Sequence, residues 1–144
     1  MAGPQFFTPQ KRPVPSQPVR KFTLEQANKS LPLVKRIVAD IVSAHERATQ
    51  SQLRLEKDKG SDQRAAQKEL DASVDRLQDL VDELSDVGCE LKDYQTGLID
   101  FVGRHEGRDV YLCWKLGEEK ITHWHELDAG AAGRKPVSQL QERA

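Results

Sequence analysis

The amino-acid sequence predicts an α+β protein in which a long antiparallel helical hairpin packs with a small antiparallel β-meander. Two observations lead to this fold class. Apolar residues recur every three or four positions between about residues 31 and 91, which is typical of amphipathic helices. From Leu98 onward, short segments rich in β-branched and aromatic residues alternate with glycine-containing turns, as in a meander.

The chain divides into three parts by composition. With 144 residues it has the length of one domain. Residues 1–21 are rich in proline, which fixes φ and removes a backbone donor, so we expect a disordered leader. We expect a single α+β domain over residues 22–136 and a C-terminal tail over residues 137–144. The leader is basic and contains no acidic residue; its charges are Lys11, Arg12, Arg20 and Lys21.

The first helix is predicted to begin with a capping box. Thr23 has the side chain of a helix cap, and Gln26 stands three residues later, where it reaches back to the cap. Pro32 then interrupts the pattern, because proline removes a helical hydrogen bond and clashes with the preceding turn. We therefore predict one or two short turns, a kink, and a longer helix from about Pro32 into the fifties.

The second helix is predicted to follow the turn at Gly60-Ser61-Asp62 and to end near Gly97, a natural left-handed C-terminal residue. Its apolar residues form two neighbouring rows, which is wider than a two-stranded seam requires. Either the C-terminal part or a second subunit must cover this stripe, so a homodimer through the hairpin is expected. The two rows are Leu70, Val74, Leu77, Val81, Leu84 and Leu91, and Leu80, Val87 and Tyr94.

Three strands are predicted in the C-terminal part, from the segments "GLIDFV", "DVYLCWKL" and "KITHWHEL". Successive side chains of a strand point to opposite faces. The core face is then formed by Leu112, Trp114 and Trp124. The opposite face carries the chemically capable side chains Cys113, His123 and His125.

The densest group of such side chains lies between residues 113 and 134. Two histidines at i, i+2 on a strand, beside a thiol on the next strand, are suited to a divalent metal such as zinc. A histidine oriented by a carboxylate is also suited to proton transfer, whereas a purely structural cluster is the simplest alternative. The candidate metal ligands are His125, Glu126, Cys113 and His123. The wider candidate ligand-binding or structural cluster is Asp100, Cys113, Glu118, His125, Glu126, Asp128 and Arg134.

Arg134 has two interpretations. It follows two glycines in "DAGAAGRKP", where backbone can approach a ligand closely and a guanidinium can bind an anion or carboxylate. Alternatively, it forms an ion pair with Asp100 or Glu126 and fixes the tail. The sequence favours the ion pair.

Compartment and partners follow from composition. Cys89 and Cys113 are expected to be reduced thiols, since no export signal and no membrane-spanning run is recognisable. The protein is therefore expected to be cytoplasmic, with no membrane partner. The net charge is −1 and the leader is basic, so the remaining chain is net acidic and nucleic-acid binding is not expected.

Four segments resemble a bacterial family known as domain of unknown function 2203. They are "FTLEQANKSLPLV", "LKDYQTGLIDF", "VYLCWKLGE" and "WHELDAGAAGR", and the resemblance spans roughly residues 22–136. It implies a small cytoplasmic protein with a helical hairpin and a β-rich C-terminal part, and it implies no activity. His123 departs from the family pattern, which shifts weight toward His125 and Glu126 as functional residues.

The function predicted from these observations is that of a non-enzymatic binding or assembly module. The hairpin would provide contacts, and the cluster between residues 113 and 134 would position a ligand or partner. The alternative is a metal-binding protein or small metalloenzyme that uses the same cluster. No nucleophile motif is present, so the sequence assigns no reaction.

Overall fold

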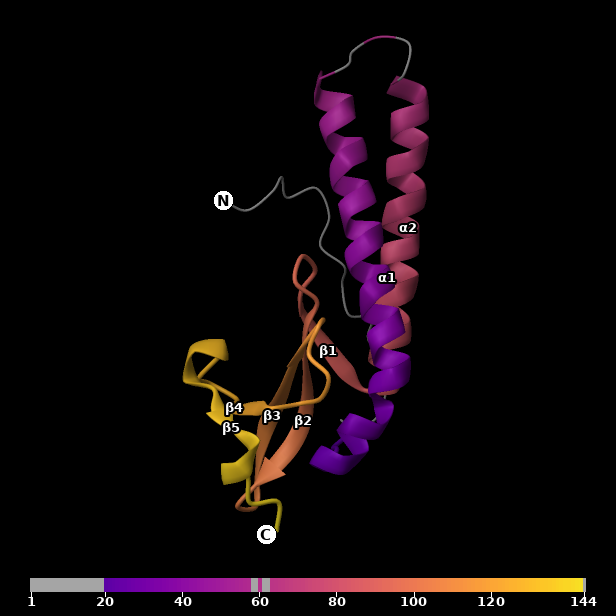
Figure 1. Ribbon diagram of the computed structural model, residues 1–144. Coiled ribbons are helices and arrows are strands. Elements are labelled where there is room, and N and C mark those ends of the chain that lie inside the picture. The colour runs from indigo at the N-terminus through magenta and orange to yellow at the C-terminus, as the bar shows by residue number, and fades with distance from the viewer. Residues whose placement is uncertain (1–19, 58–59, 61–62, 144) are drawn as a thin grey trace.

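The computed structural model describes residues 20–57, 60 and 63–143. The predicted leader lies outside the described residues, apart from Arg20 and Lys21. The α+β prediction is confirmed: two packed helices precede an antiparallel sheet (Figure 1). In chain order the elements are α1 (Leu24–Lys57), α2 (Gln63–Val87), β1 (Cys89–Asp93), β2 (Leu98–His105), β3 (Arg108–Lys115), β4 (His123–Glu126) and β5 (Lys135–Pro136), with short 3-10 helices at Ala131–Gly133 and Val137–Gln139.

Helix α1 begins with the predicted capping box. The Thr23 hydroxyl oxygen accepts the backbone N–H of Gln26 at 3.1 Å, and the Gln26 side chain accepts the N–H of Thr23 at 3.0 Å. The predicted division at Pro32 is wrong, because one helix runs through this position. Burial on both sides of the proline, at Leu31 and Val34, holds the segment together despite the lost hydrogen bond. The first turns are bent relative to the rest (Figure 1).

Helix α2 ends ten residues before the predicted position. Its last residue is Val87, and the next residue, Gly88, takes a left-handed φ of 113°. A side chain at Gly88 would meet the ring of Phe22 at 3.0 Å, so glycine is needed there for space as well as for conformation. Gly97 instead closes the turn between β1 and β2, with a φ of 72°.

The sheet has five strands in the order β1-β2-β3-β4-β5, with every neighbouring pair antiparallel. The predicted meander is therefore correct, but β1 and β5 were missed. The turn between β2 and β3 consists of Glu106 and Gly107, with φ values of 49° and 81°. Two left-handed residues favour a tight hairpin whose twist matches that of the strands. This turn fixes the register of β2 against β3.

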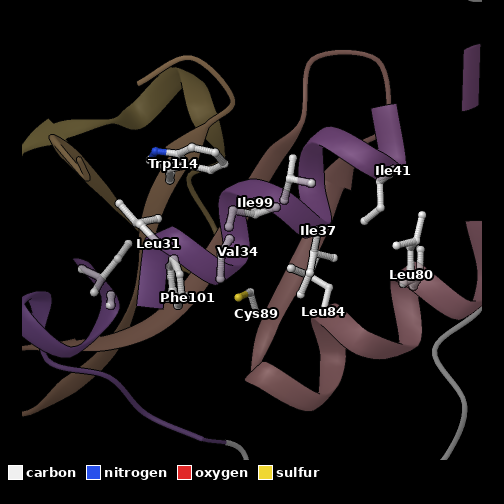
Figure 2. Packing of buried hydrophobic residues seen from close by; sticks show 14 of the residues in the cluster. Leu31, Val34, Ile37, Ile41, Leu80, Leu84, Cys89, Ile99, Phe101 and Trp114 are labelled. Carbon is white, nitrogen blue, oxygen red and sulfur yellow. The ribbon is translucent and has the colours of Figure 1, made fainter. Parts of the chain in front are cut away.

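One face of the sheet packs against α1 to form the core. Leu112, Trp114 and Trp124 are at most 1% exposed, as predicted for the core face. Figure 2 shows that apolar side chains of α1 lie between those of the sheet and those of α2. Residues from all three layers form this contact, including Leu31, Val34, Ile37, Ile41, Leu80, Leu84, Ile99, Phe101 and Trp114.

The wide apolar stripe of the helices is largely covered within one chain. Leu70, Leu77, Leu80 and Leu84 are buried, and they belong to the same core cluster as residues of α1 and the sheet. The homodimer that the stripe suggested remains a prediction. No helix in the described part of the chain is long and apolar enough to cross a membrane.

The C-terminal segment is held against the domain. The backbone N–H of Gln141 donates to Nδ1 of buried His105 at 2.9 Å, and the carbonyl of Gln141 accepts the N–H of Glu106 at 2.7 Å. The carboxylate of Glu142 accepts the N–H of Leu24 at 2.8 Å, at the start of α1. These contacts join the end of the chain to the β2–β3 turn and to the first helix.

Candidate functional site

The face of the sheet opposite the core carries a row of polar side chains, which we call the polar face. Residues paired directly across antiparallel strands share a face. Asp100 of β2 pairs with Cys113 of β3, and Cys113 pairs with His123 of β4. The neighbouring row pairs Tyr111 with His125. The sheet therefore brings together side chains that are up to 25 positions apart in the chain.

Asp100, Cys113 and His125 converge on the polar face and form what we call the Asp–Cys–His cluster. Their potential ligand atoms all lie within 4.8 Å of one another. The three residues are only 3%, 3% and 4% exposed, respectively. Cys113 lies on the central strand, and the other two side chains come from the strands on either side of it. Three different ligand types therefore gather in a buried position.

The hydrogen bond of His125 determines which ring nitrogen faces the cluster. Nδ1 lies 2.8 Å from the backbone carbonyl of Glu126, which can only accept, so Nδ1 carries a proton. In the neutral ring, the lone pair is then on Nε2, which lies 3.4 Å from Oδ2 of Asp100. An imidazole oriented in this way by a backbone carbonyl is the usual arrangement of a metal-binding histidine.

Asp100 has an unsatisfied oxygen. Its Oδ1 atom is buried and accepts no hydrogen bond. Burial raises the pKa of the Asp100 carboxyl, and the charges of His125 and Lys92 oppose this effect. A buried polar atom without a hydrogen-bond partner lowers the stability of the fold by about 1–3 kcal/mol. A proton or a cation bound at this oxygen would remove that cost.

Cys113 is not an activated thiol by itself. Burial, helped by the charge of Asp100, raises its pKa to about 11, while Arg134 lowers it by charge and by a hydrogen bond. A metal ion would reverse this balance, because coordination deprotonates a thiol outright. Neither Cys113 nor Cys89 forms a disulfide, as predicted.

Arg134 immediately precedes the edge strand β5 and has an extended backbone. Lys135 pairs with Trp124, and its ammonium lies 5.2 Å over the Trp124 ring on the core side. Because side chains alternate, the preceding residue faces the polar side. The charge of Arg134 lowers the pKa of the Cys113 thiol. The ion pair of Arg134 with Asp100 or Glu126 that the sequence favoured stays a prediction.

Glu126 lies on the opposite face, where it is engaged by another arginine. Its two carboxylate oxygens accept hydrogen bonds from the guanidinium of Arg108 at 2.9 and 2.6 Å. This contact lowers the pKa of the Glu126 carboxyl. Glu126 is therefore outside the Asp–Cys–His cluster, although it was a candidate ligand beside His125.

The remaining predicted site residues have local partners or face solvent. Nδ1 of His123 lies 2.8 Å from the hydroxyl of Thr122, and His123 is outside the cluster although it pairs with Cys113. Glu118 accepts the backbone N–H of Lys115 at 2.7 Å and stabilises the turn after β3. Asp128 is exposed.

Asp100 was predicted as a site residue but not as a metal ligand. The signal that could have found it is the hairpin turn at Glu106-Gly107, because a two-residue turn places Asp100 opposite Cys113. Lys92 and Tyr111 were not predicted as site residues. The Lys92 ammonium lies 5.0 Å over the Tyr111 ring, which in turn lies 5.4 Å from the ring of His125.

Comparison with known proteins gives one match. A family model described as "Uncharacterized conserved protein (DUF2203)" matches residues 20–137, which confirms the resemblance seen in the sequence. No curated protein and no solved structure matches the chain.

Proposed function

This chain belongs to the DUF2203 family of uncharacterized conserved proteins, and we propose that it binds a divalent transition metal, best zinc, through Asp100, Cys113 and His125. The observation that carries the proposal is the convergence of the three buried ligand atoms within 4.8 Å. Zinc is bound in proteins by this combination of carboxylate oxygen, thiolate sulfur and imidazole nitrogen.

The surroundings of the cluster support a metal rather than a plain hydrogen-bonded group. His125 donates from Nδ1 to a backbone carbonyl, so Nε2 offers a lone pair toward Asp100. The unpartnered Oδ1 of Asp100 is a second buried atom that a cation would satisfy. A cation between these groups satisfies the imidazole and the carboxylate together.

The ligand types discriminate between metals. Mg²⁺ and Ca²⁺ prefer shells made of oxygen, whereas thiolate and imidazole select zinc and its neighbours. Three protein ligands leave one position of a tetrahedral ion for an exogenous group, unlike the closed four-ligand shells of structural zinc sites. The proposal is thus an exchangeable metal site, and it includes no reaction.

The proposed metal binding takes up the alternative predicted from the sequence, a metal-binding protein, with Asp100 in place of Glu126 and His123 among the ligands. Assembly through the helical hairpin is kept as a separate prediction. Both thiols are free and buried, which fits a reducing compartment, and we propose a cytoplasmic location on that basis.

The test is elemental analysis of the untagged full-length protein, purified without chelator and with zinc in the growth medium. We expect one equivalent of zinc per chain. His125→Ala and the isosteric Asp100→Asn should each lose it, whereas the matched control His123→Ala should retain it. Circular dichroism verifies that each variant is folded. Metal-free wild-type protein that also fails to take up added zinc would reject the proposal.

A further inference from the structure

The last described residues, 140–143, form a short segment that we call the C-terminal strap. Gln141 attaches it through both of its backbone groups: the N–H donates to Nδ1 of His105 at 2.9 Å, and the carbonyl accepts the N–H of Glu106 at 2.7 Å. Leu140 packs against the core cluster. The strap therefore lies beside the β2–β3 turn (Figure 1), and one of its attachments is a histidine ring.

The contact with Gln141 determines the protonation state of His105. A backbone N–H can only donate, so Nδ1 offers its lone pair and the single proton of the ring is on Nε2. Nε2 lies 3.6 Å from a carboxylate oxygen of Glu106. The ring is 7% exposed and packs on Trp124, with centroids 4.3 Å apart. The attached strap thus requires a neutral His105 in this one orientation.

A second proton on His105 breaks the attachment. It must bind at Nδ1, because Nε2 already carries a proton, and the N–H of Gln141 then faces another donor. Turning the ring over does not restore the bond, since a carbon atom then occupies the place of Nδ1. Histidine is the side chain whose charge changes between about pH 5 and 8. Mild acidification therefore favours release of the strap, and release takes up a proton.

The other charged groups near the ring do not titrate in this range. The Glu106 carboxylate is bound by Arg108 at 3.3 Å, and Arg108 also binds Glu126. The Glu142 carboxylate accepts the N–H of Leu24. The charged side chains on the surrounding elements are Glu25, Glu106, Arg108, Glu126, Lys135, Glu142 and Arg143. Carboxylates ordinarily titrate around pH 4, and lysine and arginine above about pH 10, so His105 is the group that responds near neutrality.

We propose that His105 is a pH-sensitive switch: its neutral ring holds the C-terminal strap against the β2–β3 turn, and its protonated ring releases the strap. The strap is attached above the range in which histidine titrates and free below it. Release also frees the N–H of Leu24 at the start of α1, which Glu142 binds in the attached state. The inference is independent of the proposed metal site, because His105 packs on Trp124 on the core side of the sheet.

The experiment is NMR of the ¹⁵N-labelled full-length protein between pH 7.5 and 5.5. Relaxation measures the order parameter of the Gln141 amide, and the ring nitrogen signals report the tautomer and protonation of His105. We expect an order parameter of about 0.85 at pH 7.5, typical of rigid backbone, and below about 0.6 at pH 5.5. Both changes should have the same midpoint. A Gln141 amide that stays ordered after the ring is protonated, or a ring that stays neutral at pH 5.5, overturns the proposal.

Matched variants identify the responding group. In His105→Asn, the side-chain carbonyl takes the place of Nδ1 and accepts the Gln141 N–H without taking up a proton, so Gln141 should stay ordered at both pH values. His105→Ala has no acceptor and should leave Gln141 mobile at both. His45→Gln changes a histidine on α1 and should behave as wild type.

Circular dichroism verifies that each variant is folded. Release of the strap from His105→Asn at pH 5.5, to the extent seen in wild type, would assign the response to another group and overturn the proposal. Should His105→Asn fail to fold, the comparison of the two midpoints in wild-type protein decides the question by itself.

Discussion

Nε2 of His125 lies 3.4 Å from Oδ2 of Asp100, and both side chains are buried. Since Nδ1 of the same ring donates to the Glu126 carbonyl, two hydrogen-bond acceptors face each other unless a proton or metal ion lies between them. Cys113 adds a third ligand atom within 4.8 Å. The three strands thus meet at a contact that needs a proton or a metal ion between its acceptors.

Zinc is therefore expected to stabilise the folded protein. A ligand present at about 100 times its Kd and bound only by the native state adds roughly 2.7 kcal/mol to the free energy of unfolding. For a chain of this size we expect the Tm to rise by roughly 5–10 °C. Differential scanning calorimetry with and without zinc measures the change. Asp100→Asn should abolish the rise and Glu126→Gln should not, and an equal rise in both would contradict the assigned ligands.

The helix–helix seam is tested by truncating one buried leucine. Leu77 is 0% exposed, so Leu77→Ala should lower the free energy of unfolding by roughly 2–5 kcal/mol through lost burial and the cavity left behind. Leu77→Asp should prevent folding, because it buries an unpaired charge. Leu33 is 51% exposed, and Leu33→Ala should change stability by less than about 0.5 kcal/mol. Urea unfolding that gives similar losses for both alanine variants would argue against this packing.

Alanine substitutions at two glycines distinguish the free-energy cost of a strained backbone from that of a steric clash. Gly97 and Gly107 both have a positive φ, and an alanine there pays roughly 1–2 kcal/mol. At Gly97 the added Cβ would also lie 2.7 Å from Val38 and 2.8 Å from Leu116, whereas at Gly107 it would meet nothing within 4 Å. We expect Gly97→Ala to be more destabilising than Gly107→Ala by about 1–3 kcal/mol in chemical denaturation. Equal losses would refute the close approach.

The capping box of α1 should contribute measurably to stability. Thr23→Ala removes the acceptor for the N–H of Gln26 and should cost roughly 0.5–2 kcal/mol in the free energy of unfolding. Thr23→Ser keeps the hydroxyl and should recover most of this loss. Thermal unfolding followed by circular dichroism compares the three proteins. A serine variant as unstable as the alanine variant would show that the methyl group, and not the cap, matters.

His45 should make stability fall at acidic pH. Burial lowers the pKa of its ring, and the charge of Asp93 only partly opposes this. The folded state then binds the proton more weakly than the unfolded state, whose histidine pKa is about 6.5. The contribution of neutral His45 is therefore complete above pH about 6.5 and is lost as the pH falls through the lowered value.

The measurement is urea unfolding of wild type and His45→Gln from pH 7.5 to 5. The difference between their free energies of unfolding isolates His45 from other titrating groups. The ring also stacks on Tyr94, with centroids 5.2 Å apart, so a constant offset between the two proteins is expected at high pH. The difference should shrink below pH about 6.5, and a difference that is constant across the range would contradict the prediction.

The sequence by itself determined the fold class, the capping box at Thr23 and Gln26, and the alternation of the strands. These features depend on residues within a few positions of one another, so the local pattern of the sequence predicts them. Alternation alone placed Trp114 and Trp124 on the core face and separated Cys113 and His125 from Glu126. For that reason Cys113 and His125 could be named as metal ligands from the sequence, whereas Asp100 was named only as a member of the wider cluster.

Only the tertiary structure decided where helix α2 ends and which residues form the Asp–Cys–His cluster. Helix α2 ends at Val87 because Phe22, more than sixty residues away, packs where a side chain at Gly88 would lie. Asp100 lies near His125 because the register of β2 against β3 pairs it with Cys113, on the same face of the sheet as His125. Glu126 is held away from the cluster by Arg108, whose guanidinium donates to both of its carboxylate oxygens. These outcomes depend on contacts between distant segments, and the three-dimensional packing alone sets them.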